Sequence, residues 1–132
     1  MRYIIATLIS FICLTGFAQT QAEMNQQANE SYAKADKELN TIYKQLLLEY
    51  KTDTAFTRNL KASQRIWITF RDAELKMKYP ERKPGTYGTI QPVCEASYLE
   101  MLTRERIKTL KTWIDGIEEG DICGGSVKIK EK

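Results

Sequence analysis

The chain has 132 residues, carries a formal net charge of +3 at pH 7 and contains no histidine. The absence of histidine excludes Ser–His and Cys–His nucleophilic pairs and histidine-ligated metal sites. The mild positive charge gives no indication of binding to nucleic acid or to a membrane surface. Because the sequence also lacks a glycine-rich phosphate loop, we expect no cofactor and no metal.

The N-terminal segment has the composition of a secretory signal peptide. Arg2 precedes fifteen almost wholly apolar residues, 3–17, and the small residues Gly16 and Ala18 suit cleavage after Ala18. Such a segment is too short to span a bilayer comfortably, which needs about 20 residues. We therefore predict a signal peptide over residues 1–18, with an uncleaved N-terminal anchor as the alternative. Cleavage predicts a periplasmic or secreted protein with no stable membrane insertion.

The first helix of the mature chain is predicted to begin at Thr20 and to run to about Tyr50. Thr20 and Glu23 match a capping box, in which two side chains satisfy free backbone donors at a helix start. An apolar stripe follows at helical spacing: Met24, Ala28, Tyr32, Ala35, Leu39, Ile42 and Leu46. Three further side chains lie along its edge: Asp36, Asn40 and Tyr43.

The second predicted helix contains residues 60–77, LKASQRIWITFRDAELKM, which include no glycine and no proline. Thr52 and Asp53 are plausible N-caps, and Pro80 ends the helix near Tyr79. The short connection makes the first two helices antiparallel neighbours. Residues that recur at steps of four and three form the predicted packed face: Phe56, Leu60, Ser63, Trp67, Phe70, Glu74 and Met77.

Polar residues lie both beside this packed face and opposite to it. Gln64 and Arg71 flank Trp67, whereas Arg65 and Asp72 point almost directly away from Trp67. Arg65 and Asp72 are therefore candidates for contact with a partner. The alternative interpretation is that both are solvated surface charges.

A third helix is predicted to begin between Ile90 and Pro92, after a loop over residues 80–89 that is rich in proline and glycine. Its stripe is formed by Leu99, Leu102, Arg106, Leu110, Trp113 and Ile117. Gly116 or Gly120 ends the helix, and residues 119–132 are predicted to form a flexible tail. The predicted fold is all-α, a small antiparallel bundle of three main helices within residues 19–118.

Arg106 is the one charged residue in the middle of the third stripe. An unpaired charge there would be costly, so it calls for a carboxylate. Two antiparallel connections make the first and third helices parallel and set Asp36 about one turn from the level of Arg106. We predict an Arg106–Asp36 ion pair, with Asn40 or Tyr43 donating to the carboxylate. The alternative is that Arg106 extends past the apolar edge to water.

The cysteines leave two alternatives open. Cleavage of the signal peptide removes Cys13, whose bulky neighbour Ile12 disfavours lipid attachment, and leaves Cys94 and Cys123. Export favours a disulfide between them. A helix from Cys94 to Asp115 would be about 31 Å long, and an extended return with a bridge spans barely that distance. The disulfide therefore requires a tail extended along the third helix or a break in that helix; two free thiols are the alternative.

Four segments in this order resemble the LprI-like family of small secreted bacterial proteins: TQAEMNQQA, YAKADKELNTIYKQL, LKASQRIWITFRDAEL and LTRERIKTLK. The resemblance covers about residues 20–111, and its QRxWxxFRDAE core is the most specific part. Twelve residues match the family motif: Asp36, Leu39, Asn40, Tyr43, Gln64, Arg65, Trp67, Arg71, Asp72, Leu102, Thr103 and Arg106. Of these we assign eight to a structural polar network: Asp36, Asn40, Tyr43, Gln64, Trp67, Arg71, Thr103 and Arg106. The family commonly has cysteine where Gln27, Leu75 and Tyr98 stand here, so its disulfides cannot be carried over.

The resemblance implies a small, helical, exported domain and, more loosely, lysozyme inhibition. We therefore predict a non-enzymatic binding protein for which lysozyme is a candidate partner. An envelope structural or stress protein with an unidentified protein partner is the alternative. An enzyme is disfavoured because no motif places a pair of carboxylates for acid–base chemistry. Cleavage leaves a charge of +2, which does not steer the protein toward cationic lysozymes, unless a local acidic cluster compensates: Asp115, Glu118, Glu119 and Asp121.

Overall fold

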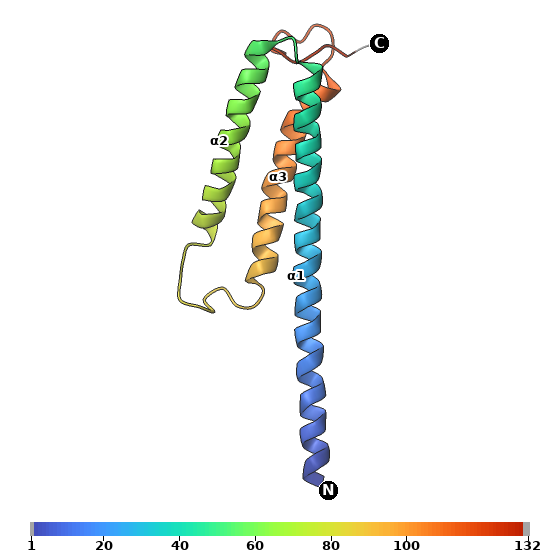
Figure 1. Ribbon diagram of the computed structural model, residues 1–132, viewed down its shortest axis with the longest axis vertical. Coiled ribbons are helices and arrows are strands. Elements are labelled where there is room, and N and C mark those ends of the chain that lie inside the picture. Colours follow the sequence, from blue (N-terminus) through green and yellow to red (C-terminus); the bar gives the residue numbers. More distant parts are fainter. Residues whose placement is uncertain (1, 131–132) are drawn as a thin grey trace.

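The computed structural model describes the backbone of residues 2–130 and the side chains of residues 20–130. Its described part contains three helices: α1 (Arg2–Glu49), α2 (Thr54–Lys78) and α3 (Gln91–Asp115). Figure 1 shows that α2 runs antiparallel to both neighbours, so that α1 and α3 run parallel, and that the N-terminal part of α1 extends beyond the other two helices. The predicted all-α bundle of three main helices is confirmed.

The first helix begins earlier than predicted. The backbone is helical from Arg2 through Thr20, so Thr20 is not a helix N-cap in this chain. No proline precedes Thr20, and an apolar segment without proline continues a helix readily. The signal peptide stays a prediction, since its side chains lie outside the described residues. Within the described residues, no helix is long and apolar enough to cross a membrane.

The core lies mainly between α1 and α3. On α1 the buried residues follow the predicted stripe at helical spacing: Ala35, Leu39, Ile42 and Leu46. They pack with Ile107 and Leu110 of α3 and with Leu60 of α2. Full burial of one such aliphatic side chain contributes about 1.5–3 kcal/mol. Burial of the α1 stripe therefore explains why the second half of α1 stays against α3.

Helix α2 has the predicted ends but a rotated packed face. The Asp53 side chain accepts a hydrogen bond of 2.9 Å from the Phe56 backbone N–H, which confirms Asp53 as the N-cap. The buried residues of α2 are Leu60 and Gln64, whereas Phe70 and Met77 of the predicted face are exposed. Ser63, which belongs to the predicted face, is exposed, and its neighbour Gln64 is buried in its place. The packed face of α2 is therefore rotated about the helix axis relative to the predicted one.

Helix α3 ends at a glycine that no other residue could replace without strain. Gly116 has φ of 75°, and a Cβ atom there would lie 2.9 Å from the Lys128 carbonyl oxygen. The close approach arises because the chain returns: Ile117 N–H donates to Lys128 O at 2.9 Å, and Lys130 N–H donates to Ile117 O at 2.9 Å. The C-terminal segment therefore lies against the end of the bundle where α1 connects to α2 (Figure 1), and its flexibility stays a prediction.

Two aromatic residues hold this returning segment. Tyr50 OH donates to the Trp113 carbonyl oxygen at 3.1 Å and accepts from the Lys128 backbone N–H at 3.2 Å. The indole N–H of Trp113 donates to Ser126 Oγ at 3.0 Å. The segment looked loose in sequence because its composition is polar and glycine-rich, and these bonds come from residues outside it.

The two described cysteines are free thiols. Cys94 lies in the first turn of α3, and Cys123 lies beyond the other end of the helix. Since α3 is unbroken over 25 residues, it separates them by most of its length of about 37 Å. The tail does not run back along α3, so neither condition for the Cys94–Cys123 disulfide is met, and the arrangement agrees with the alternative of two free thiols.

Candidate functional site

Arg106 reaches α2, not Asp36 of α1. Its Nε donates to Gln64 Oε1 at 3.1 Å, and one terminal nitrogen donates to Ser63 Oγ at 2.9 Å. Arg106 therefore lies on the flank of α3 that faces α2. The predicted Arg106–Asp36 ion pair is wrong. The prediction compared only the levels of the two residues along the helix axes. The direction of a side chain changes by about 100° from one helical residue to the next, and this direction also decides which helix the side chain meets.

Asp36 instead belongs to a polar cluster that links α1 and α2. Arg71 approaches Asp36 Oδ1 at 3.7 Å and holds Asp72 Oδ1 with two donors at 2.9 and 2.8 Å. Asn40 Nδ2 donates to Asp36 Oδ2 at 3.1 Å, as we predicted for the carboxylate. The guanidinium of Arg71 also lies over the Trp67 ring, 5.4 Å from its centroid.

This cluster perturbs a neighbouring phenol. Burial raises the pKa of Tyr32, the positive charge of Arg71 lowers it, and the negative charges of Asp36 and Asp72 raise it further. Glu74 of α2 lies outside this cluster and accepts a hydrogen bond of 3.1 Å from Tyr98 OH of α3. The cluster thus has a sufficient structural role in fixing α2 against α1.

The remaining residues of the predicted polar network have different surroundings. Tyr43 is half-buried and packs against the core. Thr103 is fully buried, and its hydroxyl oxygen has no hydrogen-bond partner within the described residues. The structure therefore splits the predicted network into the Asp36–Arg71 cluster, the Arg106–Gln64 contact and two separate residues.

The two residues predicted to contact a partner differ in whether their side chains are held by an ion pair. Both Arg65 and Asp72 are exposed, as predicted. The carboxylate of Asp72 is held by Arg71, whereas Arg65 forms no ion pair within the described residues. Arg65 is therefore the freer of the two to meet another molecule.

An exposed apolar stripe runs along α2. Ile66, Phe70 and Met77 are 70%, 49% and 68% exposed. Their spacings of four and seven residues place them on one side of the helix. We call these three residues the α2 apolar stripe; it was predicted in part as core, and the rotation of α2 leaves it facing solvent.

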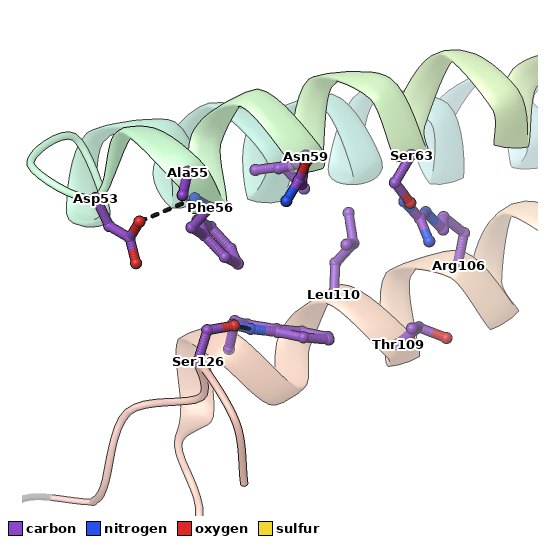
Figure 2. A pocket seen from close by; sticks show the side chains of 11 residues that line it. Asp53, Ala55, Phe56, Asn59, Ser63, Arg106, Thr109, Leu110 and Ser126 are labelled. Carbon is purple, nitrogen blue, oxygen red and sulfur yellow. Dashed lines mark hydrogen bonds between the residues drawn. The ribbon is translucent and has the colours of Figure 1, made fainter.

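A cavity of about 440 Å³ lies between the first half of α2, the second half of α3 and the C-terminal segment. Figure 2 shows Phe56 and Asn59 pointing from α2 toward α3, and Leu110 pointing back toward α2. Eleven residues line it: Asp53, Ala55, Phe56, Asn59, Leu60, Ser63, Arg106, Thr109, Leu110, Trp113 and Ser126. The sequence did not indicate this cavity, because one wall depends on how far α2 stands from α3 and another on the returning tail.

The cavity combines aromatic walls with a cation. The Phe56 and Trp113 ring centroids are 6.2 Å apart, and Tyr50 stacks behind Phe56 at 4.3 Å. Burial lowers the pKa of the Arg106 guanidinium, which nevertheless stays charged in proteins. No carboxylate lies within ion-pair distance of Arg106 among the residues that the structure describes.

A metal site in the described part of the chain would need a cluster of metal-binding side chains. Among the described residues, no group of three or more histidine, cysteine, aspartate or glutamate side chains could hold a metal ion. The described surface offers apolar contact area, charged side chains and the cavity between α2 and α3.

Comparison with known proteins gives one family. The family model described as "Lysozyme inhibitor LprI" matches residues 15–110. An uncharacterized protein of Rhizobium meliloti (strain 1021) is 29% identical over 112 residues, which covers 76% of this chain and 78% of that protein. No solved structure matches the chain.

Proposed function

The chain belongs to the lysozyme inhibitor LprI family, and from this premise we propose that it is an exported, non-enzymatic binding protein that inhibits a lysozyme. The observation that carries the proposal is the family match over residues 15–110, which includes most of α1, all of α2 and most of α3. The predicted signal peptide, residues 1–18, would direct export and would place the protein in the periplasm or outside the cell.

The α2 apolar stripe is the surface that we assign to the partner. Inhibition of an enzyme that cleaves a carbohydrate polymer requires a rigid surface that covers the enzyme's site and requires no chemistry of the inhibitor. Interface centres are enriched in aromatic residues, methionine and arginine. Ile66, Phe70 and Met77 provide such a centre, and Arg65 and Asp72 lie farther round the same helix as a polar rim.

Electrostatic attraction contributes little in this proposal. The acidic cluster at the end of α3 is partly neutralised, because Lys130 Nζ pairs with Glu118 at 2.7 Å and the Asp121 carboxylate accepts from the Cys123 backbone N–H at 2.9 Å. The affinity must therefore come mainly from apolar contact. We accordingly expect binding to depend only weakly on salt concentration.

An envelope structural or stress protein with a different protein partner is the second candidate. The observation that favours it is the net positive charge, which does not attract cationic lysozymes over distance. The two functions share the α2 apolar stripe and differ in what covers it. Lysozyme activity in the presence of the purified protein separates them.

The experiment titrates lysozyme with purified protein and follows residual hydrolysis of cell-wall substrate. We expect inhibition to be complete near equimolar concentrations. Ile66→Asp should weaken inhibition at least about tenfold, because burying a charge in an apolar interface is costly. Leu48→Asp is the matched control, since Leu48 of α1 and Ile66 are both 70% exposed.

Lysozyme activity that is unchanged at stoichiometric concentrations would refute inhibition. If the same preparation then captured another envelope component and lost it on Ile66→Asp, the second candidate would be supported. Equal effects of the two aspartate variants would refute the assignment of the partner surface to α2.

A further inference from the structure

The cavity between α2 and α3 contains a charge that the described structure leaves uncompensated. Two of the five N–H donors of Arg106 are engaged, one by Gln64 and one by Ser63. Both acceptors are neutral, and the described part of the chain offers Arg106 no carboxylate within ion-pair distance. A half-buried guanidinium gains most from an anion, particularly a carboxylate, which its planar donors fit with two parallel bonds.

The side chains that line the cavity beside Arg106 indicate what the remainder of a bound ligand would be. Leu110 and Trp113 follow Arg106 on α3 by four and seven residues, so their backbones rise about 6 and 10 Å further along the helix. Phe56 points toward α3 from α2 (Figure 2), and Leu60 of α2 also lines the cavity. A group that reaches these side chains from Arg106 must be apolar or aromatic and several carbon atoms long.

We propose that this cavity binds a small amphipathic carboxylate, with its carboxylate on Arg106 and its aromatic or aliphatic body against the apolar walls that Phe56, Leu110 and Trp113 form. Its volume of about 440 Å³ lies within the usual range for small-molecule sites, about 300–1,000 Å³. Ser63 and Gln64 hold the guanidinium in place, and Ser126 fixes the Trp113 ring from the tail. The site lies apart from the α2 apolar stripe in residue content and does not depend on lysozyme inhibition.

The test uses N-acetyl-L-phenylalanine as the acid probe and N-acetyl-L-phenylalaninamide as its uncharged counterpart. Binding is followed by the indole N–H resonances of the two tryptophans in the isotope-labelled full chain. Trp113 lines the cavity and Trp67 does not, so Trp67 serves as an internal reference. A ligand of about 15 non-hydrogen atoms should bind with a Kd on the order of 1 mM.

We expect the acid to shift the Trp113 resonance saturably and the amide to bind at least about tenfold more weakly, because a hydrogen bond to a charged group is lost. Arg106→Gln should weaken acid binding by a similar factor. Arg104→Gln is the matched control, since Arg104 lies on α3 outside the cavity and pairs with Glu38 and Glu100. Both variants lose one arginine charge, so only position distinguishes them.

A second variant keeps the test independent of Arg106. Thr109 is exposed and lines the cavity, so Thr109→Phe should fill the space without disturbing the core and should abolish binding of the acid. The absence of a saturable Trp113 shift, equal affinity for acid and amide, or unchanged acid affinity in Arg106→Gln would each overturn the proposal.

Discussion

Asp36 and Arg106 each have a polar partner, but on different helices from those that the sequence indicated. Asp36 is 41% exposed and lies 3.7 Å from Arg71, so their coupling should be modest. In double-mutant cycles we expect Asp36→Ala and Arg71→Ala to deviate from additivity by about 0.5–1 kcal/mol. Asp36→Ala and Arg106→Met should be additive within about 0.5 kcal/mol. A larger coupling for the second pair, measured by denaturant unfolding, would contradict the assignment of Arg106 to α2.

A second prediction at this scale concerns acid. Hydrogen bonds from Gln45 at 2.7 Å and, to a smaller extent, from Lys128 at 3.1 Å lower the pKa of Glu49 below its ordinary 4.5. Because the folded pKa is the lower one, the contribution of Glu49 to stability is present above about pH 4.5 and is lost as the pH falls through the folded pKa.

An NMR titration of the Glu49 side chain measures this effect. Gln45→Ala should raise the pKa of Glu49 toward 4.5 by more than Lys128→Met does, since the Gln45 hydrogen bond is the larger cause. The second variant also reports on the tail, because Lys128 belongs to it. A pKa of Glu49 that neither variant changes would show that the two donors do not act on it.

Sequence reasoning at the residue scale succeeded where the interaction was local. The Asp53 N-cap and the Asn40–Asp36 hydrogen bond both join residues three or four positions apart. The contact of Arg106 with Ser63 crosses between helices and depends on the rotation of α2 about its own axis. A rotation of α2 by a few tens of degrees changes which polar residues at the edge of its packed face meet α3. The sequence pattern does not specify this rotation.

Among the elements, the C-terminal segment makes contacts that the sequence did not indicate, and Tyr50 is the residue that anchors it. Tyr50→Phe removes a hydroxyl that donates to Trp113 O and accepts from Lys128 N–H. Loss of two hydrogen bonds should lower the free energy of unfolding by about 1–3 kcal/mol and increase hydrogen exchange at Lys128.

Tyr43→Phe is the control for this change. Tyr43 is a half-buried tyrosine of α1, seven residues before Tyr50, and it contacts the core without a hydroxyl hydrogen bond within the described residues. We expect its substitution to leave stability within about 0.5 kcal/mol. Equal effects of the two substitutions would mean that the tail is not held through Tyr50.

The elements themselves were largely predictable. Helix α2 ends at the residue before its Tyr79 C-cap, and α3 ends at Gly116, because proline and glycine act on the backbone locally. The start of α1 was missed because a capping box is satisfied only where the preceding chain is not helical. The cavity was missed for a different reason. Its walls come from α2, α3 and the C-terminal segment, so predicting it requires the relative positions of all three.

In the whole molecule, most of the buried core lies between α1 and α3, and α2 is partly uncovered. Leu46 of α1 is fully buried, and Leu46→Ala should destabilise the protein by about 3 kcal/mol through lost transfer energy and a residual cavity. Leu48→Ala two residues away, where the side chain is 70% exposed, should change stability by no more than about 0.5 kcal/mol. Chemical denaturation of both variants measures the difference, and similar values would show that the core is placed wrongly.

The separation between the buried core and the exposed α2 apolar stripe gives the proposed function its physical basis. A core that depends on α1 and α3 leaves the α2 apolar stripe available to a partner without loss of folding energy. The two faces of α2 therefore have separate tasks: Leu60 and Gln64 face the bundle, and Ile66 and Phe70 face solvent. Substitutions on the stripe should change binding while leaving the unfolding transition unchanged.

The measurement that tests the central proposal most directly is calorimetric titration of lysozyme into the purified protein. We predict saturable binding near one-to-one stoichiometry, a negative heat-capacity change from burial of the α2 apolar stripe, and loss of the signal in Ile66→Asp. The absence of binding at protein concentrations of about 100 μM would contradict the proposal that this protein is a lysozyme inhibitor.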